Sequence, residues 1–162
     1  MRPTREQVLS IVAYDAERGI FTRLIAARNR PIGSDATVKS NNYRMILIGE
    51  KCWHAHRLAW LIVNGEWPKT QIDHINGDPS DNRIANLRLA TPAQNAQNKR
   101  VCSNSKSGIK GVSFDPKRGK WGAFIQINKR QTIIGRYGSL EDAAEAYRLA
   151  AQKHFGEYAR TI

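Results

Sequence analysis

The sequence predicts an α+β fold made of two small modules, the second a three-stranded antiparallel sheet packed on one helix. Three observations lead to this prediction. The 162 residues, 41% of them hydrophobic, suffice for two packed cores. Short strand-like runs are interspersed with capped helical runs. Over residues 99–107 the periodicity stops and small polar and basic residues dominate, as in a linker.

The first module begins with a short helix. Thr4 and Gln7 have the spacing of a capping box, ahead of an apolar run that reaches Val12. A charged Gly-containing turn follows, and a strand is predicted over 20–24.

A hairpin and a helix come next. The runs 43–48 and 52–55 are separated by three residues that include Gly49, a common hairpin loop length. Helical spacing then extends over 56–64 and ends at Gly65.

Two further strands flank a polar loop full of turn-forming residues. They are predicted over 72–75 and 84–90, with Leu87 and Leu89 on one face. Thr91 can cap the helix that follows, and Pro92 then occupies the first helical position, where Pro is favoured. The helix completes the first module, residues 1–98, whose core spans 53–98.

The second module, residues 108–162, follows the linker. Its strand-like runs cover 111–114, 121–128 and 131–137, and a helix is predicted over 139–155. Ser139 and Asp142 have capping-box spacing at its start. The helix also carries a stripe of mostly small residues that lets it lie close to a sheet: Ala143, Ala146, Tyr147, Ala150 and Ala151.

The net charge of +12 indicates a polyanionic partner. Residues 1–98 hold 13 basic and 9 acidic side chains, whereas 99–162 hold 13 and 5, so the second module is the expected anchor. Charge alone also fits ribosomal proteins or anionic membrane surfaces and leaves the activity open.

Several classes of protein are disfavoured. The longest apolar run is far shorter than the roughly 20 residues of a membrane span, and the start lacks the apolar region of a signal peptide. A cytoplasmic protein without membrane partners is therefore expected. Cys52 and Cys102 form no CxxC pair, so they predict neither a zinc knuckle nor a disulfide framework.

Residues 71–98, QIDHINGDPSDNRIANLRLATPAQNAQN, carry an unusual combination of motifs. An Asp-His pair, a polar loop, an Asn-Leu-Arg-Leu strand and an Asn-rich helix start lie within 28 residues. A lone His in such a pair is more often structural or solvent-facing, but the combined order is hard to obtain by chance. The segment resembles the ββα-metal motif of HNH endonucleases, with His74, Asn86 and Asn95 at the three motif positions. Asn95 stands where many members have a final His.

The resemblance implies a metal-dependent DNA endonuclease of the homing or phage type, whose product carries a 5′ phosphate. It implies Asp73 and Asn95 as metal ligands, and it implies that Asn86 supports catalysis structurally by tying the loop that holds the base. Two protein oxygens suit one Mg²⁺, or Mn²⁺, better than zinc.

His74 is the candidate general base. An imidazole with an ordinary pKa of about 6.5 is mostly neutral at physiological pH and can take a proton from water. In a regular strand Asp73 points to the opposite face, although a local twist would let both side chains reach one phosphate.

The H-R-L-A-W run ahead of this segment also occurs in the family. Arg57 is a candidate phosphate contact and His56 a candidate packing residue, and structural roles are favoured for both because the run has the spacing of ordinary core. His54 is expected to be exposed.

The second module resembles DNA-binding domains of the Apetala/ethylene-response-factor type. The resemblance rests on Gly111-Val112, Trp121, Ala123, Ile125, Gly135, Ala143-Ala144, Ala146-Tyr147, Ala150-Ala151 and Gly156. A sheet face of this kind can enter the major groove. The resemblance places the DNA-facing positions at Lys110, Ser113, Phe124, Gln126, Gln131, Ile133 and Arg136, with Tyr147 near the backbone.

Basic residues in the predicted turns are expected to grip phosphates without reading sequence. They are Lys117, Arg118, Lys120, Lys129 and Arg130. For each alone, a solvated charge is the ordinary interpretation, and their clustering beside a polar sheet face favours binding.

We therefore expect a monomeric endonuclease that acts on double-stranded DNA and needs no small-molecule cofactor. The main alternative is a catalytically inactive DNA-binding regulator on the same scaffold. RNA binding is a weaker alternative, because the sheet face lacks paired stacking aromatics.

Overall fold

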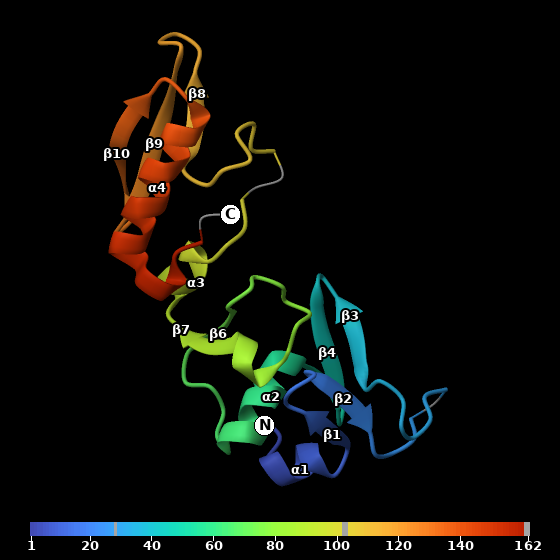
Figure 1. Ribbon diagram of the computed structural model, residues 1–162. Coiled ribbons are helices and arrows are strands. Elements are labelled where there is room, and N and C mark those ends of the chain that lie inside the picture. Colours follow the sequence, from blue (N-terminus) through green and yellow to red (C-terminus); the bar gives the residue numbers. More distant parts are fainter. Residues whose placement is uncertain (28, 102–103, 161–162) are drawn as a thin grey trace. The chain divides into compact units, whose positions relative to one another are not determined.

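The computed structural model describes residues 1–27, 29–101 and 104–160, which form two compact units, Met1–Thr91 and Pro92–Ile162 (Figure 1). The units divide ahead of the predicted end of the first module at residue 98. The reason is that α3 (Pro92–Gln97) lies against the 3-10 helix η2 (Gly156–Tyr158) of the second unit. Cys52 is exposed, and Cys102 lies outside the described residues.

The N-terminal unit starts with α1 (Arg5–Leu9), in which Thr4 and Gln7 form the predicted capping box. The predicted extension of this helix to Val12 is wrong, because Val12 begins β1 (Val12–Asp15). This strand pairs antiparallel with β2 (Ile20–Arg23). The fully buried Val8, Val12 and Phe21 join these short elements into one core.

A second sheet has the order β3-β4-β5 and consists of β3 (Thr37–Ser40), β4 (Tyr43–Ile48) and β5 (Lys51–His54). Strand β3 was not expected from the sequence. The hairpin turn is also one residue shorter than predicted, because Lys51 pairs with Ile48 and leaves a two-residue loop. Its first residue, Gly49, has a φ of 61°, which favours glycine.

Helix α2 (Ala55–Asn64) buries Leu58, Ala59 and Leu61 in the core shared with the strands. It ends at Gly65, which adopts the left-handed conformation. No helix of the described chain is both long and apolar enough to span a membrane.

Strands β6 (Gln71–His74) and β7 (Leu87–Ala90) pair antiparallel and complete this unit. Residues Ile84–Asn86, predicted as strand, form the 3-10 helix η1. The predicted apolar face is only partly right, since Leu87 is buried while Leu89 is 38% exposed.

The C-terminal unit contains the predicted three-stranded antiparallel sheet, in the order β10-β9-β8, with one long helix packed on it (Figure 1). Its elements are β8 (Val112–Asp115), β9 (Lys120–Ile127), β10 (Arg130–Tyr137) and α4 (Leu140–Phe155). Ser139 caps α4 by accepting from the backbone N–H of Asp142. The helix stripe meets the sheet through the buried Ala143, Tyr147 and Ala151.

Candidate functional site

The Asp-His pair lies at the end of β6 in the interior of the N-terminal unit. Asp73 is 3% exposed and His74 is 6% exposed. In the β6–β7 ladder, Asp73 stands opposite Arg88 and His74 opposite Leu87. The strand register therefore gives the carboxylate a cation for a partner and gives the imidazole an apolar one.

Arg88 holds Asp73 through a single carboxylate oxygen. The Oδ2 atom accepts from Nε of Arg88 at 2.9 Å and lies 2.8 Å from Nη2. Both side chains are largely buried, so the interaction is little screened by water. This pairing compensates the negative charge and fixes the orientation of the carboxylate.

His74 lies among aromatic side chains from neighbouring elements. The ring of His56, from α2, is 5.1 Å away edge-on, and Tyr43, from β4, is 6.3 Å away. Tyr43 also contacts His56 at 5.6 Å and His54 at 5.2 Å. The expected exposure of His54 is wrong, because the ring stacks on His56 and is partly buried.

Burial makes this cluster favour neutral imidazoles. It lowers the pKa of His74, while the side chain of Asn82 and the charge of Asp73 oppose that shift. For His56, burial together with the neighbouring His74, His54 and Arg57 lowers the pKa to about 3. A neutral ring at His74 is the form that can accept a proton.

Asn86 ties together the two ends of the loop between β6 and β7. Its Oδ1 accepts from the backbone N–H of Asn76, and its Nδ2 donates to Oδ1 of Asn76 and to the carbonyl of Asp81. Its own carbonyl accepts from the N–H of Ile75. The loop that follows His74 is therefore closed over a short span.

The structure brings Asp73, His74 and Asn86 together in the N-terminal unit and places Asn95, partly buried, on α3 of the C-terminal unit. Over residues 1–27, 29–101 and 104–160, no group of three His, Cys, Asp or Glu side chains is arranged to hold a metal ion. A cation at Asp73 would need carboxamide, water or phosphate oxygens as its other ligands. Such an oxygen-rich donor set fits a hard divalent cation.

The segment that carries these side chains, and the C-terminal unit, both resemble known protein families. Residues 54–97 match a family model described as HNH endonuclease, and residues 107–157 match one described as AP2 domain. Protein 3.8 of Escherichia phage T7 is 35% identical over 106 residues, which cover 65% of this chain and 87% of the phage protein. The chain belongs to the HNH endonuclease family.

A second relative of this HNH protein is the "Uncharacterized HNH endonuclease L560" of Acanthamoeba polyphaga mimivirus. It is 37% identical over 106 residues, 64% of this chain and 54% of the mimivirus protein. The HNH match contains Asp73, His74, Asn86 and Asn95.

The AP2 domain of this HNH protein presents most of the candidate DNA-contacting residues to solvent. Gln126 and Gln131 are cross-strand partners, so their exposed side chains share one face of the sheet. Arg118 is exposed but engaged by Asp115 at 2.8 Å. The other exposed candidates, on the strands and in the two turns, are Ser113, Lys117, Lys120, Lys129, Arg130 and Arg136.

Two candidates are engaged by backbone oxygens. Arg57 donates to the carbonyls of Thr70 and Pro68, and so holds the connection between α2 and β6. Lys110 donates to carbonyls at the end of α3. Sequence reasoning missed Tyr43 and Arg88, and the register of β6 with β7 is the signal from which Arg88 could have been found.

Proposed function

We propose that this chain is a divalent-metal-dependent DNA endonuclease in which His74 is the general base. The observation that carries the proposal is the buried Asp73-His74 pair on β6, inside the segment that matches the HNH family. Asp73 and Asn95 are the proposed ligands of one Mg²⁺ or Mn²⁺ ion. When bound, such an ion stabilises the charge that develops on the phosphate and the departing 3′ oxygen.

The protein side chains divide the remaining work. His74, kept neutral by burial, takes a proton from the attacking water. Arg88 keeps the Asp73 carboxylate in one orientation, and Asn86 closes the loop that follows the base. The basic AP2 domain holds double-stranded DNA, with phosphate contacts from its turns and base contacts from the sheet.

Cleavage of supercoiled plasmid with Mg²⁺, with and without chelator, tests the proposal. We expect His74→Ala to lower the cleavage rate by about 10²-fold or more, the contribution typical of a general base. DNA affinity measured in chelator should stay close to that of the parent, because the base does not hold DNA.

His154→Ala is the matched control, since His154 is exposed on α4 of the other unit. Equal activity of His74→Ala and the parent would overturn the base assignment. A parent protein that binds DNA tightly but leaves it intact at every metal concentration would instead indicate the inactive regulator.

A further inference from the structure

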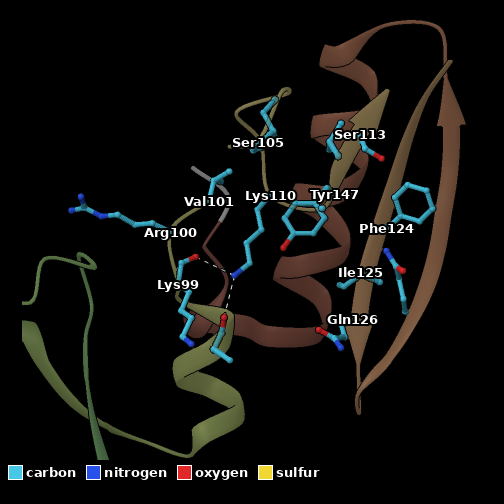
Figure 2. A pocket seen from close by; sticks show the side chains of 15 residues that line it. Lys99, Arg100, Val101, Ser105, Lys110, Ser113, Phe124, Ile125, Gln126 and Tyr147 are labelled. Carbon is cyan, nitrogen blue, oxygen red and sulfur yellow. Dashed lines mark hydrogen bonds between the residues drawn. The ribbon is translucent and has the colours of Figure 1, made fainter. Parts of the chain in front are cut away.

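Lys110 lies just before β8, and its side chain points to the end of α3 rather than to solvent (Figure 2). The ammonium donates to the carbonyl of Gln97 at 2.6 Å, to that of Lys99 at 3.2 Å and to that of Ala96 at 3.3 Å. The three contacts use the three donors that an ammonium group has.

The end of a helix is a favourable place for such a cation. The last carbonyls of a helix have no partner within it, and the helix dipole concentrates negative charge there. Burial, together with the neighbouring Arg160 and Lys99, lowers the pKa of Lys110, so the contacts with carbonyls have to compensate for a poorly solvated charge. Lys110 therefore anchors the C-terminal end of helix α3.

This anchor joins two functional segments. Helix α3 carries Asn95 and ends the HNH match at residue 97, whereas Lys110 belongs to the AP2 match that begins at residue 107. One ammonium group therefore fastens the last helix of the nuclease motif to the first strand of the DNA-binding domain.

We propose that Lys110 is a positioning residue for the nuclease reaction, fixing α3 on the AP2 domain so that Asn95 is held for metal binding. This inference rests on the proposed function, in which Asn95 binds the ion. It differs from the role that the resemblance gives to Lys110, which is a contact with DNA.

The test compares Lys110→Met with the parent in the full chain. In a His74→Ala background, in which cleavage is expected to be at least about a hundredfold slower, Mn²⁺ binding to the protein with duplex DNA is followed by electron paramagnetic resonance. We expect Lys110→Met to weaken Mn²⁺ binding about tenfold, as is typical when a residue that orients a metal ligand is lost. In the cleaving protein, the Mg²⁺ concentration for half-maximal rate at saturating DNA should rise by a similar factor.

Lys117→Met is the contrasting variant, since Lys117 is an exposed candidate phosphate contact in the β8–β9 turn. It should weaken DNA binding in chelator and leave the metal dependence unchanged. Lys110→Arg should largely restore metal binding, because a guanidinium can also donate to several carbonyls. Thermal unfolding of each variant shows whether it is folded.

Unchanged Mn²⁺ affinity in Lys110→Met, with DNA affinity lowered as in Lys117→Met, would overturn the inference and make Lys110 a phosphate contact. If Lys110→Met does not fold, Lys110→Arg is the variant that tests the inference. A folded Lys110→Arg that does not bind Mn²⁺ nearly as well as the parent would count against the inference. A parent that binds Mn²⁺ but does not cleave would refute the proposed function, and the binding comparison would still decide the role of Lys110.

Discussion

The imidazole of His56 is buried in the N-terminal unit, in surroundings that disfavour its protonation. It is 7% exposed, its Nδ1 atom has no hydrogen-bond partner among the residues that the structure describes, and its ring contacts those of His54, Tyr43 and His74. These contacts offer no anionic partner to a protonated ring. Protonation of His56 therefore destabilises the folded state relative to the unfolded state.

This cost predicts acid sensitivity. The unfolded chain binds a proton at His56 below about pH 6.5, whereas the folded chain does so only near a pKa of about 3. The contribution of neutral His56 to the free energy of unfolding is therefore fully present above about pH 6.5. Below that pH it decreases by about 1.4 kcal/mol per pH unit. Urea unfolding at pH 7 and pH 5 should show a loss of about 2 kcal/mol from His56.

His56→Leu should remove that share of the pH dependence, while the exposed His154→Leu should leave the dependence unchanged. An equally steep acid limb in His56→Leu and the parent would show that His56 is not its source.

Individual site residues were predictable to the extent that they share one stretch of chain. Asp73 and His74 stand next to each other in sequence, so their placement on one strand followed from local pattern. The contacts of His74 with Tyr43 and His56 did not, because they depend on how a hairpin and a helix pack on β6. The ion pair of Asp73 with Arg88 needed the register of two strands.

At the scale of elements, β8, β9 and α4 pack closely around Gly111, the residue that precedes β8. Gly111 has a φ of 71°, and a Cβ atom there would run into the ring of Tyr147 and the carbonyl of Phe124. The N–H of Phe124 also donates to the carbonyl of Gly111 at 2.7 Å. Only glycine satisfies both the backbone conformation and the close approach.

Gly111→Ala should destabilise the AP2 unit by at least about 1 kcal/mol, the cost of a left-handed conformation for a residue with Cβ, with the clash added to it. Thermal unfolding and DNA affinity in chelator measure the effect. The control is Gly138→Ala, because a Cβ atom at Gly138 meets nothing within 4 Å. Similar melting temperatures for the two variants would contradict the packing argument.

Elements with strong local signals were predicted well. Caps and turn residues marked α1, α2 and α4, and the three strands of the AP2 sheet alternate clearly. Strands β1 and β3 were missed because neither shows a distinctive pattern of its own, and each is ordered by pairing with a partner strand. The 3-10 helix at Ile84–Asn86 runs directly into β7 and was therefore predicted as part of that strand, but its conformation is set by the loop that Asn86 closes.

At the scale of the whole molecule, charge is distributed unequally between the units. Residues 92–162 hold 13 basic and 5 acidic side chains, and residues 1–91 hold 13 and 9. Counterion release then makes DNA affinity salt-dependent, with log K falling by about 0.9 per neutralised phosphate for each unit of log salt.

Binding of the full chain to duplex DNA, measured in chelator over a range of salt, tests this distribution. Lys117→Met should lower the magnitude of the slope by about 0.9, because one phosphate contact is lost. Lys39→Met, at an exposed lysine of β3 in the other unit, should leave the slope unchanged. Equal effects of both substitutions would show that the two units share the phosphate contacts.

The membership of α3 in the C-terminal unit has a consequence for chimeric proteins. An exchange of AP2 domains at the linker, after residue 98, would sever the helix from the lysine that secures its end. A junction between Thr91 and Pro92 would instead transplant helix and anchor as one piece, together with the last asparagine of the motif. AP2 domains that are exchanged to alter the DNA target of such proteins should therefore be transferred together with helix α3.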